Sequence, residues 1–379
     1  MLSAALPFHV YVLTGSVLAT TAMFMARTLP SLILAPFAGV LVDRWDRRTT
    51  QIWSDLARGA VVSALIVASS AESIWLVYVV AFMESSISQV ARPAVAALVP
   101  ALVRPEELAR ANSLSSVRWH MSLILGFPLG GALLALAGFP FVVVIDAISY
   151  LVSALLLLGI RPGAYRFSPT SPDRTKSPGR FRDELVEGFR AVAMRRQVAF
   201  PVIVFGAIGI ASGVVNPLLA PFVKTVLNGG PTEFGWLAAS QGIGGVAGGI
   251  LLGRFWHTAR RSAVVFGSMG VGLGLFLMAK IHAFAIPLLG LAAVPAVVGG
   301  VTLQTILQEA TEDRLRGRIF ALLGTISAAV VLLGAGMSGV LGDRVGIVPT
   351  ITLGAGIFVA AGIVARFCLP ASQDRERTP

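Results

Sequence analysis

The chain has 379 residues, of which 55% are hydrophobic and only 13% are charged, whereas about a quarter of the residues of an ordinary soluble domain are charged. This composition argues against a soluble globular protein, and 40 glycines set within long apolar runs argue against a disordered one. One cysteine, Cys368, excludes an internal disulfide, and no cluster of Cys or His suggests a metal site. We expect neither a metal nor a cofactor.

Apolar runs long enough to cross a bilayer recur along the chain. A hydrocarbon core about 30 Å thick needs about 20 apolar residues per helix. Eleven runs of that kind predict membrane-spanning helices at residues 17–41, 51–70, 74–97, 113–137, 140–160, 199–223, 234–253, 262–281, 284–307, 319–341 and 348–369. Residues 1–13 are apolar but too short to cross, and they lack the features of a signal peptide. We predict that they are the second half of a truncated first helix, so that the parent architecture has twelve spans.

Basic residues gather at one end of the predicted spans. With the truncated helix counted as the first, the loops after even-numbered spans, the middle segment and the C-terminal tail hold 23 Lys and Arg, against three on the opposite side. Lys and Arg in short loops stay cytoplasmic, so this asymmetry predicts a cytoplasmic C-terminus. The 27 Arg against 3 Lys, beside many Ala and Gly residues, are typical of a GC-rich bacterial genome, and we expect a protein of the bacterial inner membrane. The asymmetry also explains the net charge of +11 without nucleic acid as a partner.

The middle segment divides the chain. We predict an N-terminal bundle at 1–160, a cytoplasmic linker at 161–198, a C-terminal bundle at 199–370 and a cytoplasmic tail at 371–379. Within the linker, apolar residues recur at helical spacing from Phe181 to Val192, with arginines on the other faces. This pattern predicts an amphipathic helix on the membrane surface, and a plain connecting helix is the alternative.

A charged loop follows the span at 17–41. It reads GVLVDRWDRR at 39–48, and Asp55 and Arg58 follow in the next span. Gly39 permits a close helix approach, while Asp43 and Arg47 can pair with the end of a neighbouring helix in one conformation and release it in another. Simple sidedness explains the arginines but not the two aspartates among them. We interpret as a conformational clasp Gly39, Asp43, Arg44, Asp46, Arg47, Arg48, Asp55 and Arg58.

This loop resembles the signature of the major facilitator superfamily, and its surroundings resemble the branch that contains macrolide efflux pumps and the enterobactin exporter. Similar segments are TGS at 14–16, Arg27 with Pro30, ARPAVAALVPALVRPEELARANSL at 91–114 and RLRGRIFA at 314–321. The resemblance covers nearly the whole chain. It implies an all-α polytopic membrane protein with two six-helix bundles, a central cavity and alternating access, which exports amphiphilic compounds such as macrolide-like drugs or siderophores.

The span at 113–137 contains a glycine-rich motif, GFPLGG at 126–131. It resembles the Gly-Pro-x-x-Gly-Gly motif associated with antiporters of this superfamily, except that the proline comes one position later. The motif residues are Gly126, Pro128, Gly130 and Gly131. Tight helix packing is an equally good explanation for small residues at these positions.

Charged residues inside spans are costly, so each is expected to be paired or functional. Arg27 and Glu84 each lie ten residues from the outer end of their spans, and we predict that they can pair. Glu84 would then be a candidate proton carrier, with a static structural pair as the alternative. Asp146 is the other embedded acid and a second candidate for proton coupling, ranked below Glu84, with a cap or a hydrogen bond to a neighbouring backbone as the alternative. In the C-terminal half, the polar residues that we predict at a cavity are Asn216, Gln241, Gln304 and Gln308.

The chain lacks a GxxxxGK[ST] loop, so direct use of ATP is disfavoured. We predict a proton-coupled exporter whose partners are the lipid bilayer, a small-molecule substrate and protons, and which works as a monomer. A proton-coupled importer of a small metabolite is the alternative. A membrane enzyme would need a metal or nucleophile constellation, which four scattered histidines do not supply.

Overall fold

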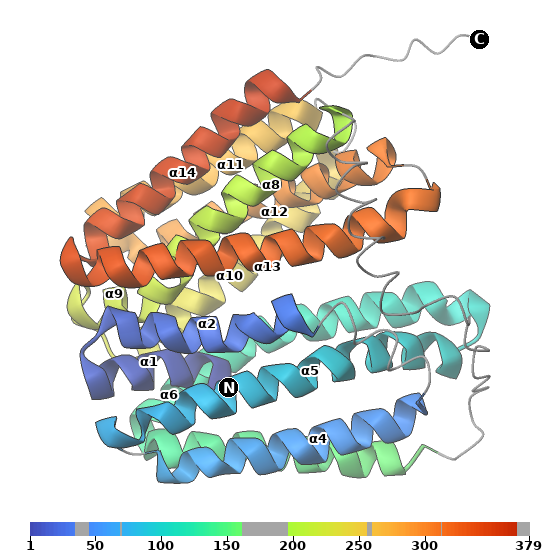
Figure 1. Ribbon diagram of the computed structural model, residues 1–379, viewed down its shortest axis with the longest axis vertical. Helices are drawn as coiled ribbons and strands as arrows, with labels where there is room; N and C mark the ends of the chain where they lie inside the picture. Colours follow the sequence, from blue (N-terminus) through green and yellow to red (C-terminus); the bar gives the residue numbers. More distant parts are fainter. Residues whose placement is uncertain (35–44, 69, 161–195, 256–259, 312, 370–379) are drawn as a thin grey trace. The chain divides into compact units, whose positions relative to one another are not determined.

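The computed structural model describes residues 1–34, 45–68, 70–160, 196–255, 260–311 and 313–369, and every regular element in these residues is a helix (Figure 1). The first half contains α1 (Leu2–Thr14), α2 (Val17–Ile33), α4 (Arg47–Ser63), η1 (Ala64–Val67), η2 (Ala71–Ser73), α5 (Ile74–Leu102), η3 (Pro105–Glu107) and α6 (Leu108–Leu158). The second half contains α8 (Arg196–Val215), η4 (Asn216–Leu218), α9 (Leu219–Thr225), α10 (Pro231–Phe255), α11 (Arg260–Lys280), η5 (His282–Phe284), α12 (Ala285–Ala310), α13 (Asp313–Arg344) and α14 (Ile347–Cys368).

Each predicted span coincides with a helix over most of its described length. Within the described residues, eight helical stretches are long and apolar enough to cross a membrane, and α1 and α2 are shorter apolar helices. The predicted span at 51–70 is α4 followed by the 3-10 turn η1. The prediction that α1 is half of a longer helix stays a prediction.

Glycines end two of these helical stretches. Gly15 has φ of 64° and donates its N–H to the Tyr11 carbonyl, while the Ser16 hydroxyl accepts from the N–H of Ala19 and starts α2. Gly138 has φ of 79° and ψ of 174° and divides the long α6. Glycine adopts such positive φ values without the steric penalty of a Cβ atom. Both breaks lie where the sequence predicts one apolar segment to end and the next to begin.

The chain divides into two compact units, one formed by Met1–Arg180 with Val223–Trp236 and the other by Phe181–Phe222 with Leu237–Pro379. The predicted bundles at 1–160 and 199–370 therefore fall mainly in separate units, except that residues 223–236 group with the first. Of the linker predicted at 161–198, residues 161–195 lie outside the described residues and residues 196–198 begin α8. The predicted tail at 371–379 also lies outside them.

In the first unit, α4 packs on α5 and α6, α2 packs on α5 and α1, and α1 packs on α6. The core is made of small and branched side chains, among them Leu6, Val62, Val77 and Val142. Burial of such side chains against neighbouring helices fixes which face of each helix turns inward. The polar residues of α4 and α5 that face this interior are therefore held in defined positions.

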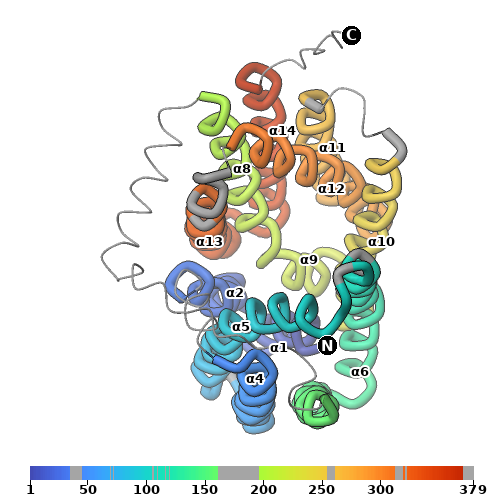
Figure 2. The backbone as a smooth tube through the Cα atoms, turned by 90° about the vertical axis from the view of Figure 1, so that its right-hand side faces the viewer, coloured from blue at the N-terminus to red at the C-terminus, as the bar shows by residue number. Residues whose placement is uncertain are grey.

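In the second unit, α8 packs on α13 and α14, and α11 packs on α12 and α14 (Figure 2). Glycines set the closest approaches: a Cβ atom on Gly213 would strike the Val331 carbonyl, and one on Gly334 would strike the Ile210 carbonyl. Gly267 of α11 and Gly299 of α12 face each other in the same way. Small residues at such crossings let helix backbones approach closely in a membrane.

Candidate functional site

Asp55 is the centre of a polar group inside the first unit. Its side chain is 2% exposed and pairs with Arg58 one turn later on α4. Ser153 of α6 donates to Asp55 Oδ2 at 2.7 Å, and Gln51 Nε2 donates to Oδ1 at 3.1 Å. This buried carboxylate is thus satisfied by a cation and two neutral donors, as a charge inside an apolar bundle requires.

Glu84 belongs to the same group. The Tyr150 hydroxyl donates to Glu84 Oε1 at 3.3 Å, and the Ser88 hydroxyl donates to the same oxygen at 3.1 Å. Arg58 lies 4.7 Å from the centroid of the Tyr150 ring, and its Nη1 is 3.5 Å from the Ser88 hydroxyl. Arg58 therefore stands between the two carboxylates. We refer to Gln51, Asp55, Arg58, Glu84, Ser88, Tyr150 and Ser153 as the charge cluster.

The expected pair of Arg27 and Glu84 does not form. Among the described residues, ion pairs join Asp55 to Arg58 and Asp146 to the amino group of Met1, while Arg27 Nη2 donates to the Ser3 hydroxyl at 2.8 Å. The count of residues from the outer ends of two spans predicts that Arg27 and Glu84 lie at a similar depth in the membrane. It does not predict toward which neighbouring helix each side chain points. Arg27 faces α1, whereas Glu84 faces α4 and α6.

Asp146 is a residue of α6, and its side chain lies beside the first residues of α1. Its Oδ1 accepts from the N–H of Leu2 at 3.4 Å and is 3.7 Å from the Met1 amino group. An acidic side chain beside the first N–H groups of a helix is stabilised by the helix dipole.

The residues predicted as a clasp are described in part, because Gly39, Asp43 and Arg44 lie outside the described residues. Asp46 is the N-cap of α4 and accepts from the N–H of Thr49 at 2.8 Å. Arg47 Nη1 donates to the Ala97 carbonyl of α5 at 2.9 Å. Arg48 donates to the carbonyls of Leu157 and Leu158 at the end of α6, at 2.9 and 3.0 Å. The start of α4 is therefore bonded to α5 and α6, while Asp55 and Arg58 belong to the charge cluster.

The glycine-rich motif of α6 lies at close helix contacts. A Cβ atom on Gly131 would strike the Pro231 carbonyl, and one on Gly130 would lie 2.7 Å from the Met1 carbonyl oxygen. Pro128 faces Gly235, because a Cβ atom added to Gly235 would lie 3.0 Å from the Cα atom of Pro128. A Cβ atom added to Gly126 would have nothing within 4 Å. Packing accounts for Gly130 and Gly131 at these positions.

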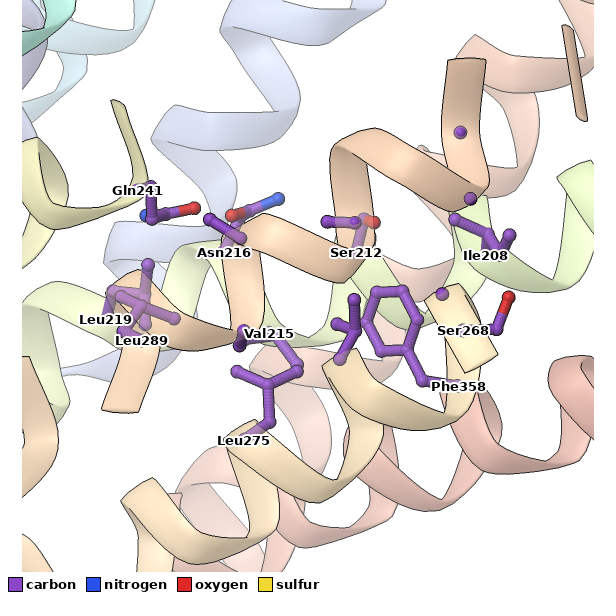
Figure 3. Close-up of a pocket in the computed structure, with 17 residues that line it drawn as sticks. Ile208, Ser212, Val215, Asn216, Leu219, Gln241, Ser268, Leu275, Leu289 and Phe358 are labelled. Carbon is purple, nitrogen blue, oxygen red and sulfur yellow. The ribbon is translucent and has the colours of Figure 1, made fainter. Parts of the chain in front are cut away.

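A cavity of about 210 Å³ lies within the second unit (Figure 3). Its wall combines apolar side chains with four polar ones and small residues of α11 and α12. The lining residues are Ile208, Ser212, Val215, Asn216, Leu219, Gln241, Gly267, Ser268, Val271, Leu275, Leu289, Ala292, Ala293, Ala296, Gly299, Gly300 and Phe358. In the view of Figure 3, Gln241, Asn216 and Ser212 form a row along one side, and Val215, Leu275 and Leu289 lie on the other.

Two of the four predicted cavity residues line this space. The side-chain amides of Asn216 and Gln241 make no hydrogen bond to another described residue, so they are available to a ligand. Gln304 and Gln308 are exposed and do not line it. The sequence carries one signal for the position of the cavity, because Asn216 and Pro217 end α8 inside an apolar stretch, and broken helices commonly mark transporter sites.

In the described residues, no group of three His, Cys, Asp or Glu side chains could hold a metal ion.

Three residues of the charge cluster were not predicted from the sequence. They are Ser88, Tyr150 and Ser153, which complete the cluster from α5 and α6. A hydroxyl in an apolar helix most often bonds to its own backbone, and the sequence gives no sign that these three do otherwise.

Comparisons with known proteins agree with this architecture. A family model described as "Transmembrane secretion effector" matches residues 5–379. Macrolide efflux protein A of Streptococcus pyogenes is 27% identical over 376 residues, which cover 96% of this chain and 90% of that protein. The putative bacilysin exporter BacE of Bacillus subtilis is 24% identical over 359 residues, or 94% of this chain and 89% of that protein. A bacterial homologue of the iron transporter ferroportin, solved in an inward-facing state, superposes with a TM-score of 0.73 at 15% identity, over 96% of this chain and 94% of that one.

Proposed function

Since the chain belongs to the transmembrane secretion effectors of the major facilitator superfamily, we propose that it is a proton-coupled exporter of amphiphilic small molecules that works by alternating access. It is a multi-pass membrane transporter with the all-α fold of that superfamily. The names of two relatives, an efflux protein and a putative exporter, support the outward direction.

The observation that carries the choice of substrate is the cavity of the second unit. In the view of Figure 3, three of its four polar residues, Ser212, Asn216 and Gln241, lie in a row, and the aliphatic residues Val215, Leu275 and Leu289 lie on the opposite side. A molecule with one apolar and one hydrogen-bonding side satisfies both walls, whereas a fully polar metabolite would leave the aliphatic wall without a partner. This lining favours an amphiphile, such as a macrolide-like drug or a siderophore, over the cargo of a sugar or acid importer.

The charge cluster is the proposed site of proton coupling. Arg58 pairs with Asp55 and contacts Ser88, which donates to Glu84, so an ionised Glu84 adds one negative charge to a pair that is already neutral. Protonation of Glu84 removes this charge. Because a net charge inside the bilayer is costly, proton binding and release at Glu84 can favour different conformations of the transporter.

The proposal places the protein in the cytoplasmic membrane of a bacterium as a monomer, with the C-terminus in the cytoplasm.

The test of export is accumulation of labelled macrolides and amphiphilic dyes in an efflux-deficient bacterium with and without the protein. We expect the protein to lower accumulation, and an uncoupler to restore it to the level of cells without the protein. An importer would instead raise accumulation, and an uncoupler would lower it. Unchanged accumulation of every compound, with the protein present in the membrane, would refute the exporter proposal for this substrate class.

A further inference from the structure

The cavity of the second unit is lined without any ionisable group. The described lining residues include no Asp, Glu, Lys, Arg or His, and its polar atoms are amides and hydroxyls. We propose that this cavity is a subsite for an uncharged ring that bears hydroxyl or amide groups, and that it rejects cations. The inference deepens the proposed function, on which it rests, by naming the part of the substrate that enters the second unit.

The size of the cavity limits what it can hold. An apolar cavity of about 150 Å³ in another protein holds one benzene molecule. The cavity of about 210 Å³ therefore accommodates one ring with its substituents rather than a whole macrolide. The rest of a larger substrate must lie outside this cavity, where the described lining residues set no requirement.

The two unpartnered amides define the hydrogen-bonding requirement. Asn216 and Gln241 each offer two N–H donors and one carbonyl acceptor. Hydroxyl and amide groups both donate and accept, so they can pair with either side chain. A ligand without such groups would leave both amides without partners when water is displaced, which lowers affinity.

The absence of a carboxylate among the described lining residues sets the charge requirement. An ammonium group that enters the cavity loses its water shell and gains neutral acceptors instead of an anion. Burial without a counter-charge disfavours the charged form. Many amphiphilic drugs are amines, so this cavity would separate neutral amphiphiles from cationic ones of the same shape.

The test uses two ligands of nearly equal size, phenyl glucoside and phenyl glucosaminide, whose sugar ring is the part expected to enter the cavity while the phenyl ring stays outside. They differ in one hydroxyl that is replaced by an ammonium group at neutral pH. Their binding to the purified full chain in lipid nanodiscs is measured by titration calorimetry. We expect the neutral glucoside to bind about tenfold more tightly than the cationic one, and Asn216→Leu to weaken the glucoside about tenfold, since a lost hydrogen bond contributes on this scale. Equal affinities, tighter binding of the cation, or no binding of either compound would overturn the proposal.

A charge substitution in the cavity gives the decisive comparison. Gln241→Glu keeps the shape of the side chain and adds an anion, so we expect it to reverse the preference and bind the glucosaminide more tightly. A preference that stays unchanged in this variant would show that the ring binds elsewhere. Loss of uncoupler-sensitive efflux tests the exporter function separately, so efflux of dyes together with no glucoside binding would refute only the subsite.

Substitutions at two glycines test whether the glucoside binds in this cavity. Gly300 lines the cavity, and a Cβ there would have nothing within 4 Å; the same holds for Gly356 of α14, which does not line it. We expect Gly300→Leu to narrow the cavity and abolish glucoside binding, and Gly356→Leu to leave it unchanged. Equal effects of the two substitutions would exclude this cavity as the binding site.

Discussion

At Glu84, two neutral donors and a nearby cation surround one carboxylate. Tyr150 and Ser88 donate to the same oxygen, and Arg58 contacts the Tyr150 ring while it pairs with Asp55. Arg58 is thus positioned to respond to the charge of both carboxylates. Glu84 and the residues around it come from three different helices, α4, α5 and α6.

We expect Glu84→Gln to abolish uncoupler-sensitive efflux while the amount of protein in the membrane stays the same. The amide keeps the shape and can still accept from Tyr150 and Ser88, but it cannot bind a proton and release it. The measurement is drug accumulation in cells with and without uncoupler. Glu72→Gln, at an exposed carboxylate of η2, is the control and should transport normally. Normal efflux by Glu84→Gln would remove Glu84 from the proton pathway.

Tyr150→Phe should shift the pH dependence of transport without abolishing transport. The ring stays beneath Arg58, but the ionised Glu84 loses one donor, so the protonated form gains relative stability. One neutral hydrogen bond contributes about 1 kcal/mol, which corresponds to a shift of less than about one pH unit, toward higher pH. The measurement is efflux from proteoliposomes as a function of pH, with Tyr78→Phe of α5 as the control. An unchanged pH profile would contradict a role for Tyr150 in positioning Glu84.

At the scale of helices, the start of α4 is bonded to the ends of two neighbours. Asp46 caps α4, and the two arginines that follow it donate to carbonyls near the ends of α5 and α6. A helix C-terminus has unpaired carbonyls and partial negative charge, which cations stabilise. Adjacent arginines on one helix can therefore hold two other helices together.

Substitutions at Asp46 separate the capping of α4 from its charge. Asp46→Ala should lower the stability by about 1 kcal/mol, because the N–H of Thr49 loses its acceptor. Asp46→Asn keeps a good N-cap and should unfold at nearly the same temperature as the original protein, as measured by thermal unfolding in detergent. If the loop acts as a clasp that needs the charge, both variants should transport more slowly. Normal transport by Asp46→Asn would limit Asp46 to capping.

The glycine-rich motif of α6 contains its own control. Gly131→Leu should lower the thermal stability markedly, because its side chain would collide with the Pro231 carbonyl, whereas Gly126→Leu meets open space. Overpacking of this kind costs about 1–3 kcal/mol. The measurement is the unfolding temperature of each variant together with its efflux rate. Slow efflux by a stable Gly126→Leu variant would favour an antiporter role of the motif over packing alone.

The sequence predicted the positions of the helices but not their rotation about their axes. Apolar runs of about 20 residues identify spans because a bilayer demands that length, and the break at Gly138 was visible as a short gap between two such runs. Direction around a helix depends on which neighbour it packs against. For this reason the predicted pair of Glu84 and Arg27 was wrong, and Tyr150 and Ser153 were not predicted as members of the charge cluster. Gln304 and Gln308 were also predicted at the cavity, although neither lines it.

At the scale of the whole chain, the family and the transporter fold were predictable, because a loop motif and several distant segments resemble one superfamily together. This resemblance is confirmed by the family match over residues 5–379. The proton coupling, the substrate and the sidedness depend on the energetics of conformations and on the asymmetry of charge between loops.

The single cysteine provides a test of sidedness in the unmodified chain. Cys368 is half-buried at the end of α14, on the side where basic residues predict cytoplasm. A membrane-impermeant maleimide should label it in inside-out vesicles and leave it unlabelled in intact spheroplasts. Cys368→Ser controls for labelling of other proteins. Labelling in intact spheroplasts would reverse the predicted orientation.

The neutral lining of the cavity has an electrical consequence. A cargo without charge carries no current, so a proton that enters the cell in exchange for it moves one positive charge that nothing compensates. Such a cycle is electrogenic, and a membrane potential of 100 mV, negative inside, would contribute about 2.3 kcal/mol per proton to it. For a cargo that is uncharged as a whole, and not only in the ring that enters the cavity, voltage would therefore drive export in addition to the pH difference.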